Sequence, residues 1–343
     1  MVSYYNNWIN ELNKYSKILV NEEMFMLRFE AIESEIKKVE EYSNPQNFDI
    51  IYQLINNLKD IKSEKISILA GGGIDSNLLI LLSNKIYKKD NIKIYSIETK
   101  DNSQDIKELI KLSRKLKIKH YIFTLKENDV KESLDYFYKR YHRYPRDEAY
   151  PAIFKIVKEV SESQENIIFI DGQYADTYTF SNPQNIYQLI WRRLPNLNFH
   201  KLKFMRKSSK FISLIIGLFT NNIEFLLYFC QIQDTKIIRK SLTNLLSRTT
   251  LDFEVIFQIV FKECLLFYRE EDKYRVPSKI ISPFKDENLF IHSCNNLNIY
   301  RSIFKKKKPI YKYIKNNFKK FKIKSYERSF KFKSYLKNIN IQN

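Results

Sequence analysis

Glycine is scarce in this chain, with five among 343 residues. Three of the five are consecutive, Gly71 to Gly73, and a fourth is Gly172. Glycine adopts a positive φ at no steric cost and lets a ligand come close to the backbone. Because both places follow short apolar runs, we expect backbone groups to be needed at the ends of two strands.

Cysteine and histidine are also few, and their spacing excludes several kinds of site. The three cysteines are widely separated and form no C-x-x-C pair: Cys230, Cys264 and Cys294. Neither a disulfide framework nor a zinc site is indicated. The four histidines show no paired metal spacing and no legible Ser/His/Asp arrangement: His120, His142, His200 and His292. We expect a structural role for His120, at the start of a predicted strand.

Long apolar runs and targeting signals are lacking. Residues 1–6 show no basic segment, apolar run or cleavage site of a signal peptide. The most apolar stretch, 211–230, is interrupted by Asn221, Asn222 and Glu224, which leaves either side too short to cross a bilayer. An amphipathic pair resting on a membrane is an alternative for this stretch, but core helices are the commoner outcome. We therefore expect a cytoplasmic protein.

Positive charge is concentrated at one end. The net charge is +20, and residues 301–343 hold fifteen Lys or Arg against one acid, Glu327. A basic tail can meet nucleic acid, anionic lipid or a polyanionic substrate, or it can be a solvated helix face. Apolar residues recur within it, which predicts an amphipathic helix docked on the rest of the protein: Ile303, Phe304, Ile310, Tyr313, Ile314 and Phe318.

Short apolar runs alternate with helix-length segments in the first half of the chain. The runs predict strands at 66–70, 92–97, 120–125 and 167–170. The segments between them predict helices at 77–86, 105–116, 130–141 and 151–160. This alternation predicts an α/β fold, a parallel sheet with helices on both faces.

We divide the chain into four regions on this pattern. Residues 1–60 form a helical N-terminal segment, 61–184 the nucleotide-binding α/β domain, 185–300 a mostly helical part that completes the site, and 301–343 the basic tail. Ligands of parallel sheets bind at the carboxyl ends of the strands, where both glycine-marked loops fall.

The loop Gly71-Gly72-Gly73-Ile74-Asp75-Ser76 joins a predicted strand to a predicted helix. Backbone N–H groups and the helix N-terminus then point at one spot, which favours an anion. The loop is neither a Walker A loop nor a G-x-G-x-x-G fingerprint. The alternatives are a tight turn without a ligand and, for Asp75, an acid stabilised by the helix dipole by about 0.3–1 kcal/mol.

These residues resemble the PP-loop, Ser-Gly-Gly-x-Asp-Ser, of the ATP pyrophosphatases. Gly72, Gly73, Asp75 and Ser76 match it, whereas Gly71 replaces its leading serine. The resemblance implies an adenine nucleotide alpha hydrolase-like fold, binding of the β- and γ-phosphates of ATP, and transfer of AMP to a substrate with release of pyrophosphate.

Further segments resemble the synthetase domain of asparagine synthetase and its relatives, over roughly residues 45–335. In chain order they are Tyr95-Ser96-Ile97-Glu98, Leu112 to His120, Gly172-Gln173-Tyr174-Ala175-Asp176, Asp272-Lys273 and Pro283-Phe284-Lys285-Asp286. The first of them lies along the adenine in that family. Two residues depart from the family's Gly-Glu-Gly-Ala-Asp segment: Gln173 replaces the acid and Tyr174 replaces the second glycine.

The resemblance also implies site residues. The nucleotide would be bound by Gly71, Gly72, Gly73, Asp75 and Ser76 of the loop at 71–76, which we call the phosphate loop, together with Ile97 and Gly172. Asp75 and Asp176 would hold Mg²⁺, which prefers carboxylate oxygen, although Asp176 could instead be a surface acid. Lys331 is the nearest match to a lysine that stabilises pyrophosphate, with a solvated lysine as the alternative. Asp272 is the candidate general base, with an exposed acid as the alternative.

The function that we predict is an ATP- and Mg²⁺-dependent ligase that adenylates a carboxylate and passes it to ammonia or an amine. Position 2 is Val2, so the nucleophilic cysteine of a glutaminase domain is not expected, and a separate amidotransferase subunit is a candidate partner. One alternative is a tRNA-modifying enzyme similar to lysidine synthetase. Another is a non-catalytic descendant that only binds nucleotide. We do not favour nucleic acid or a membrane surface as a partner.

Overall fold

The computed structural model describes residues 20–42, 48–98, 103–147, 149–163, 167–175, 223, 226–227, 230–296 and 307–318. Several residues named above lie outside the described part: Asp176, Ile303, Phe304, Lys331 and most of the apolar stretch 211–230. Within the described part, no helix is long and apolar enough to cross a membrane.

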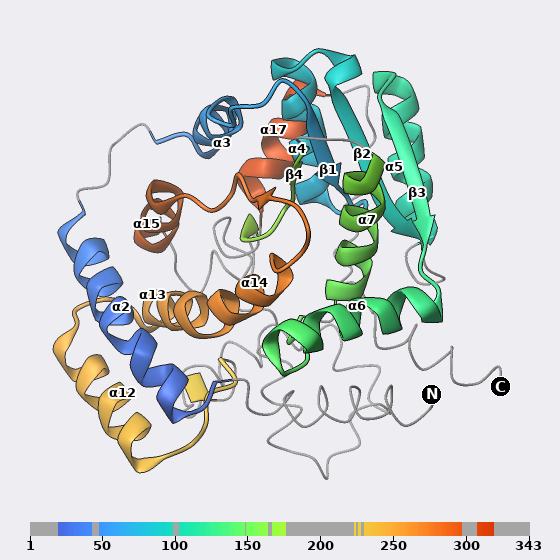
Figure 1. Cartoon of the computed structure of the whole chain (residues 1–343). Coiled ribbons are helices and arrows are strands. Elements are labelled where there is room, and N and C mark those ends of the chain that lie inside the picture. The colour runs from blue at the N-terminus through green and yellow to red at the C-terminus, as the bar shows by residue number, and fades with distance from the viewer. Residues whose placement is uncertain are drawn as a thin grey trace, which may run out of the picture.

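The described residues form a five-stranded sheet (Figure 1). Its strands run in the order β3-β2-β1-β4-β5, and every neighbouring pair is parallel. The strands are β1 (Ile66–Leu69), β2 (Ile92–Glu98), β3 (Lys119–Thr124), β4 (Ile168–Ile170) and β5 (Ile280–Ile281). The predicted parallel sheet is confirmed.

Helices cover both faces of the sheet, as predicted. Alternate side chains of a strand point to opposite faces. Ile66 and Ile68 therefore join a core with α4 (Ile74–Ile86) and α5 (Ser103–Leu116), whereas Tyr95 and Phe169 join a second core with α6 (Glu127–Tyr141) and α7 (Tyr150–Ser163).

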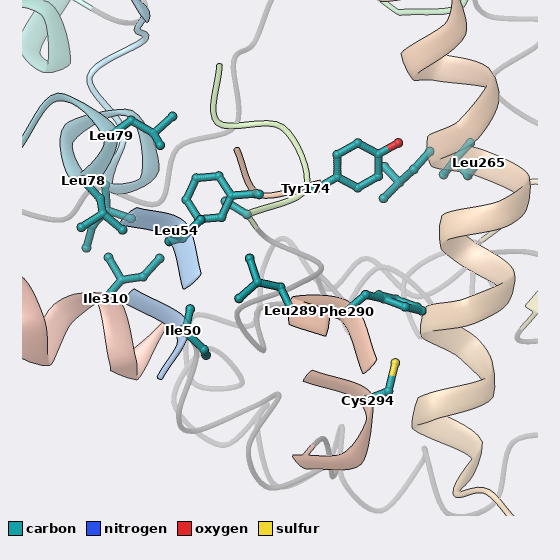
Figure 2. Close-up of a cluster of buried hydrophobic side chains, with 14 of the residues drawn as sticks. Ile50, Leu54, Leu78, Leu79, Tyr174, Leu265, Leu289, Phe290, Cys294 and Ile310 are labelled. Carbon is teal, nitrogen blue, oxygen red and sulfur yellow. The ribbon is translucent and has the colours of Figure 1, made fainter. Parts of the chain in front are cut away.

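The remaining helices extend the first core. They are α2 (Glu22–Glu41), α3 (Ile50–Lys59), α12 (Lys236–Arg248), α13 (Phe253–Val260), α14 (Phe267–Lys273), α15 (Glu287–Asn296) and α17 (Lys308–Asn317). A π-helical turn, η3 (Phe261–Leu266), joins α13 to α14, and a short 3₁₀ turn, η1 (Lys89–Asn91), precedes β2. Figure 2 shows part of this shared core, with Leu54, Leu78 and Leu289 from three separate helices.

Helix α17 confirms that part of the basic tail docks on the body. Ile310 and Ile314 are buried, and α17 packs on α3 and α4. Lys85 of α4 donates a hydrogen bond to the Tyr313 hydroxyl at 3.0 Å and lies over the Phe318 ring. The apolar face of an otherwise basic helix thus holds residues 307–318 against α3 and α4.

The fifth strand was missed by the sequence pattern. Residues 185–300 were predicted to be mostly helical, yet Ile280 and Ile281 pair with Phe169 and Ile170 at the sheet edge. Two residues are too few to show the alternation that identifies a strand. The strand forms because its backbone N–H and C=O groups find partners on β4, which lies more than a hundred residues earlier in the chain.

The three cysteines are buried, and none of them forms a disulfide. Burial raises the pKa of the Cys230, Cys264 and Cys294 thiols above the usual value, so all three stay protonated near neutral pH. Each therefore acts as a small apolar core residue.

Candidate functional site

The phosphate loop follows β1, the strand at which the order of the strands along the sheet reverses. From β1 the chain adds β2 and β3 on one side, and then β4 and β5 on the other. The crevice beyond the carboxyl ends of two such central strands is the usual ligand site of parallel sheets. Residues 71–73 leave β1 and Gly172 leaves β4, so both glycine-marked loops meet at this crevice.

Local hydrogen bonds set the course of the loop. Gly72 has a φ of +85°, and its carbonyl accepts a hydrogen bond from the Asn77 side chain at 3.1 Å. Gly73 is the N-cap of α4, and its carbonyl accepts from the Ser76 hydroxyl and from the Asn77 N–H, both at 3.0 Å. The first turn of α4 is therefore held by the loop that precedes it.

The glycines of the loop serve two different purposes. A Cβ on Gly72 would lie 2.6 Å from the backbone oxygen of Asp105, so the fold itself requires glycine there. A Cβ on Gly71 or Gly73 would meet no atom of the described residues within 4 Å. Neither of these two has a positive φ. The bare backbone at Gly71 and Gly73 therefore keeps a space open in front of the helix N-terminus, as a phosphate cradle requires.

We expect Gly72→Ala to lower the free energy of unfolding by roughly 2–4 kcal/mol, because it adds a left-handed residue and a backbone clash. Gly71→Ala is the matched control and should stay within about 0.5 kcal/mol of the parent, since its Cβ enters open space. Urea unfolding of the two variants measures the difference. Equal stability of the two would contradict the division of roles.

A hydrogen-bonded pair on the neighbouring strands, the buried Ser96 and the half-buried His120, contacts the residue that precedes the loop. The Ser96 hydroxyl donates to the Ala70 carbonyl at 2.7 Å and lies 2.9 Å from His120 Nε2. Burial lowers the pKa of His120 to about 4, so the ring is neutral at physiological pH. This contact gives His120 the structural role that the sequence suggested.

Lys307 is a cation of the site that the sequence did not reveal. Its ammonium lies 2.5 Å from Asp75 Oδ2, and its side chain is 7% exposed. Lys307 immediately precedes α17 and has a left-handed backbone, with φ +49°. The docking of α17 thus places a buried positive charge beside the phosphate loop.

A second buried ion pair lies at the end of β4. Lys273 of α14 contacts Asp171 at 2.7 Å and donates to the Gln173 side-chain oxygen at 3.0 Å. Burial acts to lower the pKa of Lys273, but Asp171 and Asp147 outweigh it, and the pKa is raised. Next to Asp171, a Cβ on Gly172 would be 3.3 Å from the Asp75 Cβ. The β4 loop and the phosphate loop are therefore in direct contact.

Asp272, the predicted general base, is fully buried. Its carboxylate accepts hydrogen bonds from both terminal nitrogens of Arg143, at 2.5 and 2.9 Å, and from the Arg146 N–H at 2.8 Å. The alternative of an exposed acid is therefore wrong. These three bonds give Asp272 a role in holding the loop before α7 against α14, whereas its role as a base stays a prediction.

The carboxylates near the loop fit a magnesium ion in part. Asp75 stands in the first turn of α4, beside the open glycines, and offers the hard oxygen that Mg²⁺ prefers. Asp105, whose backbone lies close to Gly72, is in the first turn of α5 and is buried. Among the described residues there is no group of three or more metal-ligating side chains. The second predicted ligand, Asp176, lies outside them, so a metal here would depend on Asp75, on phosphate oxygens and on water.

Comparison with known families identifies the chain. Residues 62–249, more than half of the chain, match the model of the family described as asparagine synthase. The chain belongs to the asparagine synthase family. Among curated proteins, none matches the sequence.

One similar solved structure is an NH3-dependent NAD synthetase from Campylobacter jejuni subsp. jejuni NCTC 11168 in complex with the nitrate ion. It is 16% identical, and the alignment covers 72% of this chain and 98% of that chain, with a TM-score of 0.28. So low a TM-score carries no structural inference.

Tyr174, where the asparagine synthase pattern has glycine, keeps the backbone conformation of a glycine. Its φ is +68°, which is costly for a bulky residue. The ring is buried in the first core, near Leu265 in Figure 2, and its hydroxyl donates to Glu270. Lys285 in turn donates to both oxygens of Glu270, at 2.9 and 3.0 Å. The bulky side chain therefore points into the core and leaves the phosphate loop open.

Three site residues of this asparagine synthase relative escaped sequence reasoning, for different reasons. Lys307 stands in a run of four lysines, and its only signal was Pro309, which is typical of the start of a helix. Lys273 was noted as part of a motif but not as a buried cation. Asp171 directly precedes Gly172 and could have been found as the acid at a strand end.

Proposed function

We propose that the chain is an ATP-dependent synthetase that adenylates a carboxylate, releases pyrophosphate and passes the acyl group to ammonia or an amine. The observation that supports it most is the open loop at Gly71 and Gly73, with Asp75 and the buried Lys307 at its edge. Membership of the asparagine synthase family supports the same reaction class.

In this proposal the phosphate loop binds the β- and γ-phosphates through the backbone N–H groups of residues 71–73 and the N-terminus of α4. Lys307 stabilises the negative charge that grows on pyrophosphate as it leaves, which is a large term in such reactions. Asp75, with Asp176 as the predicted second ligand, would hold a magnesium ion that neutralises phosphate oxygens. The adenine would lie along the end of β2, at Ile97.

The carboxylate to be activated would lie at the end of β4, beside Gly172. Lys273 is held there by Asp171 and Gln173, and its charge favours an anionic group close by. Once the carboxylate is adenylated, the second step needs a positioned amine and exclusion of water. Gln173 cannot take a proton from that amine, so a base must come from elsewhere, and Asp272 stays the candidate named from the sequence.

Isotope tracing tests the reaction. With a carboxylate substrate labelled in its oxygens by ¹⁸O, we expect one label to appear in AMP, because the bond that forms joins the carboxylate oxygen to the α-phosphorus. Glutamine alone should not support turnover, whereas ammonia or an amine should. Mass spectrometry of AMP and a pyrophosphate assay report the result. ADP and phosphate as the only products would contradict the proposal.

Two further outcomes would replace the proposal by another function. Turnover that depends on RNA, with affinity falling by about 0.7 log units per log unit of salt for each phosphate contacted, would indicate a tRNA-modifying enzyme. Binding of ATP without pyrophosphate release, with any carboxylate and amine, would indicate a descendant that only binds nucleotide.

A further inference from the structure

Three guanidinium groups meet two carboxylates where the loop after α6 packs on α14. Arg143 pairs with Asp272 through both terminal nitrogens. Arg275, just after α14, pairs with Glu271. Each carboxylate is thus already held by one arginine, whereas the side chain of the third, Arg146, forms no ion pair among the described residues.

Arg146 has weak partners for its charge. Among the described residues, its guanidinium contacts the Met24 sulfur at 3.6 Å and lies over the Tyr268 ring, 5.2 Å from the centroid. A thioether is a poor acceptor, and a ring face offers only modest attraction to a cation. The bond from Arg146 to Asp272 uses the backbone N–H, not the side chain.

The surroundings make this arrangement unfavourable for stability alone. The side chain is partly buried, and burial, together with the neighbouring Arg143, lowers the pKa of Arg146, although Asp272 and Glu271 oppose the change. A charge withdrawn from water without a partner of opposite sign costs free energy. A planar guanidinium with several N–H donors is suited to bind a carboxylate or a phosphate through two bonds.

We propose that Arg146 anchors a subsite for an oxyanion, a carboxylate or phosphate group of the acid or amine substrate that does not itself react. This inference rests on the proposed function, because it assigns the group to a substrate of that reaction. Asp272 and Lys273 are consecutive on α14: the first contacts Arg143 and the Arg146 backbone, and the second contacts Asp171 beside the phosphate loop. Helix α14 also packs on α7 (Figure 1). The same helix therefore contacts both the loop that holds Arg146 and the residue that follows β4.

The test uses the full chain and two probes, sodium acetate and inorganic phosphate, each compared with chloride at equal ionic strength. We expect both probes to raise the melting temperature above chloride, because an anion bound to the folded state stabilises it. Arg146→Gln should weaken this binding by about tenfold or more, as expected for a charged hydrogen-bonding partner. Arg140→Gln is the matched control, since Arg140 is exposed on α6 and should leave binding unchanged.

Stability without the probes separates a binding role from a structural one. Arg146→Gln should melt within roughly 3 °C of the parent or above it, because the removed charge has no carboxylate of its own. A clear loss of stability with an unchanged response to acetate would overturn the proposal. So would an Arg146→Gln variant whose response to both probes equals that of the parent.

The affinity for ATP shows whether the oxyanion belongs to the nucleotide or to another substrate. If ATP binds Arg146→Gln as tightly as the parent, the group belongs to the acid or amine substrate, as proposed; weaker ATP binding would assign it to the nucleotide and overturn the proposal. Lys307→Met, which alters the phosphate loop, should keep the acetate response. Because that response needs no turnover, a failure of this inference is distinguishable from a failure of the proposed reaction, which is read from AMP and pyrophosphate.

Discussion

Replacing Lys307 by methionine is expected to raise the dissociation constant of inorganic pyrophosphate by about ten- to a hundredfold, the effect of losing one charged partner. Turnover with a competent substrate should fall by roughly 10²–10³-fold, because the ammonium stabilises charge that grows in the transition state. Methionine keeps the length and the apolar stem of lysine, so the contacts of α17 are retained. Calorimetry with pyrophosphate measures the first effect without knowledge of the substrate.

Two other lysines make the Lys307 experiment specific. Lys308→Met is the matched control, because Lys308 is the next residue along α17 and is exposed. Lys331→Met tests the lysine named from the sequence and should have no effect if Lys307 stabilises the pyrophosphate. If Lys331→Met weakens pyrophosphate binding and Lys307→Met does not, the assignment from the structure is wrong and the one from the sequence is right.

Replacing Arg143 by methionine should lower the free energy of unfolding by about 3–5 kcal/mol, because it leaves the Asp272 carboxylate buried without its partner. The Asp272 side chain is 0% exposed, whereas that of Arg143 is 31% exposed. The larger part of the lost stability therefore comes from the Asp272 carboxylate, which would stay buried without its partner. Urea unfolding measures the loss. Arg140→Met, which changes an exposed arginine on α6, is the control and is expected to stay within about 0.5 kcal/mol of the parent.

A double variant separates a structural Asp272 from a catalytic one. Arg143→Met combined with Asp272→Leu should recover most of the lost stability, because replacing both members of a buried pair by apolar groups is often close to neutral. If Asp272 only holds the loop, this double variant should regain activity along with stability. Activity that stays absent in a fully stable double variant would support Asp272 as the base.

Much of the fold follows from local patterns in the sequence. The apolar runs at 66–70 and 92–97 became β1 and β2 because period and composition are properties of neighbouring residues. The loop at 71–76 was recognised for the same reason, since a turn that exposes N–H groups needs glycine in a fixed order. β5 was not recognised, because its two residues are a strand only through their partners on β4.

The site divides in the same way between sequence and structure. The sequence by itself determined the parallel α/β architecture and the position of the glycine loop and Asp75 between a strand and a helix, because these depend on patterns among neighbouring residues. Only the tertiary structure decided which of the tail's lysines reaches that acid, since Lys307 and Asp75 are 232 positions apart and meet through the docking of α17. It also decided that Tyr174 turns into the core, that Asp272 is buried and pairs with Arg143, and that the Arg146 side chain forms no ion pair among the described residues. Each of these outcomes depends on which side chains from distant segments are buried next to one another. The local sequence around each residue does not contain that information.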